Sequence, residues 1–228
     1  MDAQFGSPRL TKGALSVIDP IDGQTVKYVI AFQYNPHECS RSLQPQTTSE
    51  GGAKVEVQHL KGAPIETLKF NEVYIDAIDK LEQVDQQALE SGIYPQLSAL
   101  EMLVYPTTKQ VQDNVALLNQ GVLEVASLTA PFLLLVWGKN RVQPVRITEF
   151  SITEETYDVH LNPIRAKLSL GFQVLSYNDF SASHPGHNIF ITQQRRQEQF
   201  VRQANLPKSV DAATENVSPR FVKAADTS

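Results

Sequence analysis

The chain has 228 residues, with 20 lysines and arginines against 25 aspartates and glutamates, and a formal net charge of -5. This balance argues against a general nucleic-acid-binding protein, which concentrates basic side chains on one face. Hydrophobic residues make up 41% of the sequence, enough for a substantial core. No apolar run approaches the roughly 20 residues that cross a bilayer, so we expect no direct membrane insertion.

Cysteine content and the first residues indicate the compartment. Cys39 is the single cysteine, which excludes an intrachain disulfide and a zinc site built from several cysteines. Residues 1–10 lack the basic and apolar regions of a secretory signal peptide. We therefore expect a soluble protein that is made and kept in the cytoplasm, a reducing compartment.

The first 78 residues have the pattern of β-strands. Apolar and polar residues alternate at 15–17 and more clearly at 26–34. Asp22-Gly23 between them is typical of a tight hairpin turn in which both residues take positive φ. A further strand is expected at 68–75, where the apolar phase changes after Phe70 and indicates a bulge.

Residues 37–66 differ from their surroundings and are predicted to form a projecting arm. Residues 38–50 are polar, Gly51-Gly52 is a candidate hinge, and a short alternating strand follows at 54–60. Such an exposed strand can pair with the sheet edge of a neighbouring molecule, a contact that most proteins block. The candidate inter-subunit contacts of the arm are Val55, Val57, His59 and Leu60.

The hydrophobic period changes to that of helices in residues 79–128. We expect Asp79 to cap a helix that ends near Gly92, and Thr107 or Thr108 to cap a later one. The later helix has an apolar face made of Val111, Val115, Leu118 and Val122. We expect these helices to cover an open end or face of the sheet rather than to line a cofactor groove.

β-structure returns after residue 130. A buried strand is predicted at 132–137, a bulged strand at 145–152 and a hairpin at 157–174. The strongest alternation in the chain lies in the last of these strands, and its polar positions include Lys167, Ser169 and Gln173. Strands at both ends of the chain predict a mainly β fold with a helical insertion (α+β), in the form of a bulged antiparallel barrel or sandwich.

The predicted β domain covers residues 1–178 and includes the arm 37–66 and the helical segment 79–128. Residues 179–228 are predicted to form a C-terminal extension, which is helical at 190–204 and then flexible.

Catalytic motifs such as GxSxG, GxGxxG, the P-loop and HExxH do not occur. His37 and Cys39 could in principle form a nucleophilic pair, but no third orienting group accompanies them in the sequence. His184 and His187 lack a nearby carboxylate or cysteine, so we interpret them as loop residues. We assign no catalytic, cofactor-binding or metal-binding residue.

A small glycan- or ligand-binding β domain is the alternative function. It would stack its ligand on an aromatic side chain, with Trp137, Tyr94 and Tyr105 as the candidates. Trp137 ends a predicted buried strand, which favours a place in the core or in a contact between subunits.

Three stretches in a fixed order resemble one protein family. They are Phe32-Gln33-Tyr34-Asn35-Pro36 with Ser40 and Ser42, then Glu66-Thr67-Leu68-Lys69-Phe70 leading to Tyr74-Ile75-Asp76, then Ala130-Pro131-Phe132 through Val136-Trp137-Gly138 with the strands at 145–152 and 157–177. The series is similar to the tube-domain proteins of contractile injection systems, the phage-tail-like machines. Within that family it most resembles the tube initiator or baseplate-hub adaptor of the LysM type, although the chain has no clear LysM module.

The resemblance covers residues 10–178 and implies a tube-type β-barrel that assembles into a homohexameric ring. In the particle baseplate, such a ring would join a trimeric VgrG-like spike hub to the inner tube protein and contact other baseplate components. The implied role is structural, without catalysis or cofactor. The arm would reach the neighbouring subunit, while Lys167, Ser169 and Gln173 would face the lumen. The initiator ring, a second adaptor and a tube ring all remain possible places for the subunit.

Overall fold

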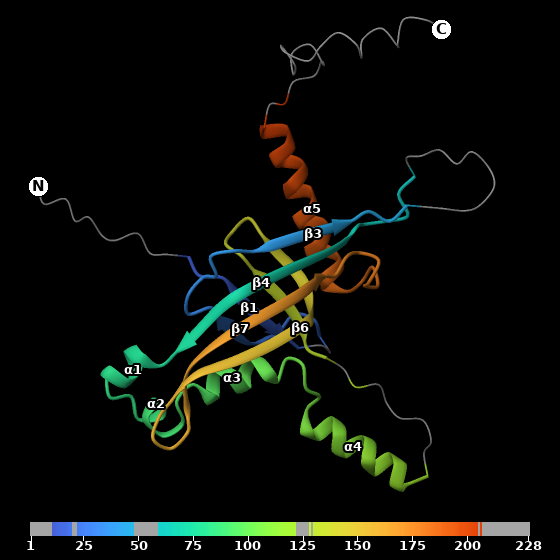
Figure 1. Cartoon of the computed structure of the whole chain (residues 1–228). Helices are drawn as coiled ribbons and strands as arrows, with labels where there is room; N and C mark the ends of the chain where they lie inside the picture. Colours follow the sequence, from blue (N-terminus) through green and yellow to red (C-terminus); the bar gives the residue numbers. More distant parts are fainter. Residues whose placement is uncertain are drawn as a thin grey trace, which may run out of the picture. The chain divides into compact units, whose positions relative to one another are not determined.

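The computed structural model describes residues 11–19, 22–47, 59–121, 128, 130–204 and 206. Seven strands form one sheet in the order β2-β1-β5-β6-β7-β4-β3, and every neighbouring pair is antiparallel (Figure 1). The strands are β1 (Ala14–Ile18), β2 (Val26–Ala31), β3 (Ser40–Gln44), β4 (Ile65–Asp76), β5 (Phe132–Val136), β6 (Val142–Tyr157) and β7 (Pro163–Val174). The helices are α1 (Ile78–Glu82), α2 (Gln86–Ser91), α3 (Tyr94–Glu101), α4 (Thr108–Asn119) and α5 (Pro185–Gln203). The predicted mainly β fold with a helical insertion is confirmed.

The chain separates into two compact units, residues 1–193 and 194–228. The whole sheet and helices α1 to α4 belong to the first unit. Helix α5 begins at Pro185, earlier than the helix predicted at 190–204. Among the described residues, no helix combines the length and the apolar character needed to cross a bilayer.

Alternation of apolar and polar residues produces the long strands β4, β6 and β7. In β7, Leu168 and Phe172 are fully buried, while Lys167 on the opposite face stays partly exposed. The pairing of β4 with β7 shifts between Phe70 and Val73, which confirms the predicted bulge. A similar shift in β6 confirms the irregularity predicted within 145–152.

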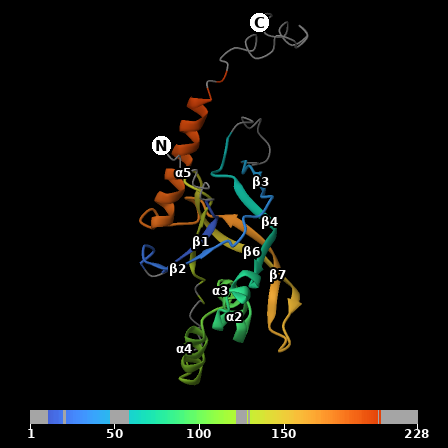
Figure 2. The same cartoon turned by 90° about the vertical axis from the view of Figure 1, so that its left-hand side faces the viewer.

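The sheet curls (Figure 2), and aromatic rings from distant parts of the chain pack against one another in its core. Phe32, which follows β2, has its ring centroid 6.1 Å from that of Phe70 in β4 and 6.1 Å from that of Trp137 beyond β5. Gly13 makes this packing possible, because a Cβ atom there would lie 2.4 Å from the Trp137 ring. Trp137 is half-buried and packs against the core, which agrees with one of its two predicted interpretations.

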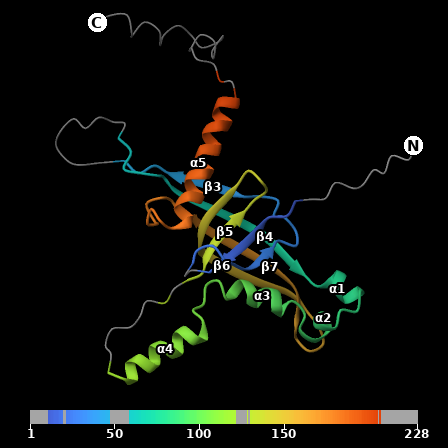
Figure 3. The ribbon, with the colours of Figure 1, turned by 180° about the vertical axis from the view of Figure 1, so that it is seen from behind.

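The sheet is not closed within the described part of the chain. Its order begins at β2 and ends at β3, so these two strands are edges. The expected barrel is therefore corrected to an open, curled sheet. Helix α3 lies beside one end of the sheet (Figure 3). Its residues line a groove between β2 and β4, where Leu100 is buried.

Two turns differ from their predictions. Val84 adopts φ 57 and interrupts the helix expected from Asp79 to Gly92, so that Asp85 caps a separate helix α2 by accepting from the Ala88 amide. In the turn before β2, Gly23 has a positive φ but Asp22 does not. Asp22 instead accepts hydrogen bonds from the amides of the two residues that follow Gly23.

Helix α4 begins as predicted but does not cover the sheet. Thr107 and Gln110 form a reciprocal capping box at its start. The side chains of Val111, Val115 and Leu118 remain 43–50% exposed, so the apolar face of α4 is not buried in the described part of the molecule. The expectation that the helices cover the sheet holds for α3, through Leu97 and Leu100, and for α2, through Ala88, but not for the described residues of α4.

Candidate assembly surfaces

The two edge strands present unpaired backbone groups and apolar side chains. On β2, Val26 and Val29 are more than half exposed. All five residues of β3 are exposed, including Leu43. An edge of this kind is a template for pairing with another strand, and proteins that do not use it usually protect it. Both edges are therefore candidate contact surfaces.

The described residues at the base of the predicted arm continue directly from β3 and lead into β4. At its base, Thr47 and Leu60 form an antiparallel bridge, and the Lys61 amide donates to the Gln46 carbonyl at 2.8 Å. His59 and Leu60 lie here, and both are exposed. The other predicted arm contacts, Val55 and Val57, and the hinge Gly51-Gly52 lie outside the described residues.

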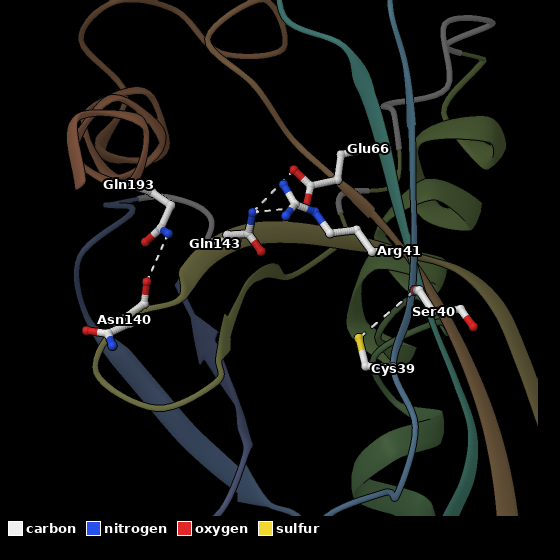
Figure 4. A network of polar contacts seen from close by, with 7 residues as sticks. All are labelled: Cys39, Ser40, Arg41, Glu66, Asn140, Gln143 and Gln193. Atoms are coloured by element: carbon white, nitrogen blue, oxygen red, sulfur yellow. Dashed lines mark hydrogen bonds and ion pairs between the residues drawn. The ribbon is translucent and has the colours of Figure 1, made fainter. Parts of the chain in front are cut away.

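A buried polar cluster fastens the edge strand β3 to the sheet (Figure 4). Glu66, on β4, accepts from Arg41 Nε at 2.6 Å, and Arg41 belongs to β3. Gln143 Nε2 of β6 donates to both carboxylate oxygens of Glu66, at 3.3 and 3.4 Å. Because Glu66 and Gln143 are buried, these bonds form in a medium that strengthens them. The base of the arm is thus held by three strands.

The role of Glu66 is missing from the sequence prediction, although the sequence carries a signal for it. Glu66 has the same alternation phase as Leu68 and Phe70, whose side chains face the core. A carboxylate on the apolar face of a strand needs a buried partner, so its position in the pattern indicates a polar cluster.

The turn between β5 and β6 lies at the same end of the sheet as the arm base. Gln193 holds this turn, because its Nε2 donates to the Asn140 carbonyl at 2.9 Å while its Oε1 accepts from the Val142 amide at 3.3 Å. The turn itself carries Lys139 and Arg141.

Cys39 lacks the environment of a nucleophile. Its Sγ donates a long 4.0 Å hydrogen bond to the Ser40 carbonyl. Burial raises the pKa of the Cys39 thiol, and the neighbouring Arg141 opposes this rise only in part. A reactive cysteine needs the opposite shift. The geometry therefore gives no support to a hydrolase built on Cys39 and His37.

An apolar groove with a volume of about 330 Å³ runs beside the free edge of β2. It is lined by residues 28–33 on one side and by Val73 and Ile75 of β4 on the other. Four residues of α3 complete the lining: Pro95, Gln96, Ala99 and Leu100. A strand that paired with β2 could place side chains in this groove, which would add specificity to the backbone contacts.

Lys167, Ser169 and Gln173 lie together on the face of β7 opposite the core, as predicted. Lys167 Nζ lies 2.7 Å from Glu72 Oε1, and Gln173 Oε1 accepts from Arg146 at 2.7 Å. Two further ion pairs cross this face, Lys69 with Glu149 and Arg165 with Glu155. Most charges on the face are therefore balanced by a partner on a neighbouring strand.

Of the aromatic and histidine candidates, Trp137 and His184 are held by local packing, whereas Tyr94 and Tyr105 are exposed. Trp137 is half-buried, and it packs against the core rings of Phe32 and Phe70. His184 stacks on Phe180 at 4.6 Å and accepts from the Gly186 amide, consistent with a loop residue. Within the described ranges, no three histidine, cysteine or acidic side chains gather closely enough to hold a metal ion.

The geometry can be compared with known proteins. A family model described as contractile injection system tube protein matches residues 10–181, a segment that contains every strand of the sheet. No curated protein matches the chain.

Proposed function

We propose, from the premise that this chain belongs to the contractile injection system tube protein family, that it is a structural subunit of a hexameric ring that joins the spike hub to the inner tube in the baseplate. Its work is mechanical, and we assign it no catalysis and no cofactor. Its partners would be copies of itself, a trimeric VgrG-like spike protein, the inner tube protein and other baseplate components. The subunit would be made in the cytoplasm and then incorporated into the particle.

The observation that carries this proposal is the open sheet with free edges at β2 and β3. Pairing of the β3 edge of one subunit with the β2 edge of the next is a heterologous contact, which forms a ring when the rotation closes. Such a ring leaves no exposed sheet edge. The same contact would bring the arm of one subunit to the neighbour that carries the groove beside β2.

The polar face of β7 supports a lumen position. Lys167, Ser169 and Gln173 lie opposite the buried side of the sheet, and ion pairs with neighbouring strands balance much of the charge around them. A channel wall of this kind neither attracts nor repels a charged cargo strongly.

A position between hub and tube requires a match between threefold and sixfold symmetry. Alternate subunits of the ring must then present the same residues in two arrangements. Within residues 38–52, β3 is held to the sheet by its pairing with β4 and by the Arg41–Glu66 contact. We therefore propose the residues of this segment after β3, 45–52, with Gly51-Gly52 as a hinge, and the chain beyond residue 178 as the adaptable parts.

The ring is tested with the double variant Val55→Asp and Val57→Asp, which places two charges on the proposed arm. Native mass spectrometry and electron microscopy should show hexamers for the wild-type protein and folded monomers for the double variant. Val111→Asp on the exposed face of α4 is the matched control and should keep the ring. Intact rings from the double variant would overturn the role of the arm. An unchanged protein that stays monomeric and never enters a tube particle would overturn the proposed function.

A further inference from the structure

The chain that precedes β1 is held at the end of β2 by one asparagine side chain. Asn35 Oδ1 accepts from the Gly13 amide at 2.8 Å, and Asn35 Nδ2 donates to the Thr11 carbonyl at 2.9 Å. The Phe32 amide also donates to the Gly13 carbonyl at 2.8 Å. Residues 1–10 are therefore attached to the described part of the chain at a fixed point beside Asn35.

The apolar groove beside β2 begins close to this point. Gln33, two residues before Asn35, lines one end of the groove, and the lining continues along β2 back to Tyr28. Among the residues that line the groove, none carries a charge. Its volume of about 330 Å³ is at the lower end of the range for small-ligand pockets. The groove therefore favours one apolar or aromatic side chain over a charged ligand.

The subunit exposes this region before it has a neighbour. Val29 and Tyr28, which line the groove, are 54% and 40% exposed. An apolar strand edge of this kind can pair with any strand that it meets, and proteins commonly cover such edges. A subunit that is made first and assembled later needs a cover that can be removed.

Residues 1–10 contain a side chain of the required kind within reach. Six residue steps separate Thr11 from Phe5, which allows at most about 20 Å of extended chain. The side of the groove along β2 covers five residue steps, about 17 Å. The sequence Gly6-Ser7-Pro8 between the two has the composition of a turn, so the chain can reverse its direction there.

We propose that Phe5 occupies the groove beside β2 in the isolated subunit, and that it is displaced when a neighbouring subunit pairs with this edge. The contact is autoinhibitory, because the neighbour's side chains compete with Phe5 for the same groove. The inference rests on the proposed function for the existence of the ring, but it concerns the subunit before assembly. Since the contact is made by a side chain, the outward amides of β2 still gain a strand partner only in the ring.

An engineered disulfide tests where Phe5 lies. In a Cys39→Ser background, Phe5→Cys is combined with Ala99→Cys, a residue of α3 that lines the groove. The matched control combines Phe5→Cys with Ser98→Cys, which is exposed on the same helix but does not line the groove. At low protein concentration, mass spectrometry without reductant separates links within one chain from links between chains. We expect the link within the chain to form several times faster with Ala99→Cys than with Ser98→Cys.

The rate of ring assembly tests the autoinhibition. Phe5→Asp should assemble about tenfold faster than the wild-type protein, which corresponds to the lower end of the free energy for burying a phenylalanine side chain. Gln4→Asp places the same charge one residue away and should assemble at the wild-type rate. Native mass spectrometry at successive times after mixing measures the fraction of hexamer for all three proteins.

The outcomes separate this inference from the proposed function. Equal linking with Ala99→Cys and Ser98→Cys, links between chains only, or a Phe5→Asp rate that is unchanged or slower would overturn the inference and leave the ring intact. A preferred link to Ala99→Cys in a protein that forms no hexamer under any condition would overturn the proposed function and keep Phe5 as the occupant of the groove.

Discussion

The backbone amide of Asp76, at the end of β4, donates to the side-chain oxygen of Gln33, just beyond β2, at 3.0 Å. In the sheet, these two strands are separated by β1, β5, β6 and β7. The bond therefore spans the opening that the backbone ladder leaves, near the contact between the tilted rings of Phe32 and Phe70. Side chains rather than a strand pairing hold the curl of the sheet.

Replacing Gln33 with alanine should loosen this curl. The Asp76 amide would lose its acceptor in a partly buried place, which typically costs about 1–3 kcal/mol of unfolding free energy. Urea unfolding followed by circular dichroism measures the loss. Gln24→Ala, in the exposed turn before β2, is the control and should leave the midpoint unchanged. Equal midpoints for the two variants would show that the Gln33 bond does not support the curl.

The junction between α2 and the hairpin turn depends on the absence of a side chain at Gly92. A Cβ atom there would lie 2.2 Å from the Pro163 carbonyl oxygen, a backbone atom that cannot move alone. Gly121 also has a positive φ, but a Cβ there would meet nothing within 4 Å. We expect Gly92→Ala to cost about 1–3 kcal/mol more than Gly121→Ala, because both share the conformational penalty and only the first is overpacked. Thermal unfolding of the two variants measures the difference, and equal losses would contradict the proposed packing.

The polar cluster at the arm base should contribute more to the free energy of unfolding than an ion pair on the surface does. Glu66→Ala leaves Arg41 and the buried Gln143 without their acceptor, and we expect a loss of about 1–3 kcal/mol. Glu149→Ala removes a partner of Lys69 from a pair in which both side chains are about half exposed, and should cost less than about 1 kcal/mol. Chemical denaturation of both variants makes the comparison. A smaller loss for Glu66→Ala would show that the cluster does not anchor β3.

Lys167 and Glu72, which pair on the polar face of β7, should shift each other's pKa. The hydrogen bond from Lys167 lowers the pKa of Glu72 below its ordinary 4.5, and the same bond raises the pKa of Lys167 above its ordinary 10.5. The contribution of the pair to stability is therefore present between these ordinary values. It is lost as the pH falls through the lowered pKa of Glu72 or rises through the raised pKa of Lys167. Carboxyl chemical shifts measured by NMR should show the pKa of Glu72 rise in the Lys167→Met variant, and an unmoved pKa would mean that the two groups do not pair in solution.

Patterns that depend on neighbouring residues were predictable from the sequence. The phase change between Phe70 and Val73 locates a bulge, and Thr107 caps α4 because its side chain bonds a residue three positions away. Contacts between segments that are distant in the sequence could not be predicted from it. Gln33 and Asp76 are separated by 43 positions, and no alternation pattern reveals that bond or the groove beside β2.

The sequence also did not reveal positions where the fold departs from the conformation or burial that the local sequence favours. A helical period continues through Val84, but the backbone there takes a positive φ that a valine disfavours. The apolar stripe of α4 likewise predicted burial, whereas its valines remain exposed. In both cases the local sequence favours a simpler structure than the fold adopts.

Hydrogen–deuterium exchange, measured on the isolated subunit and on the assembled particle, tests the central claim that subunits join through their free sheet edges. The amides of Val26–Ala31 and Ser40–Gln44 should both become slower to exchange on assembly, because each edge gains a strand partner. Exchange at these two strands that is as fast in the particle as in the subunit would contradict edge-to-edge assembly.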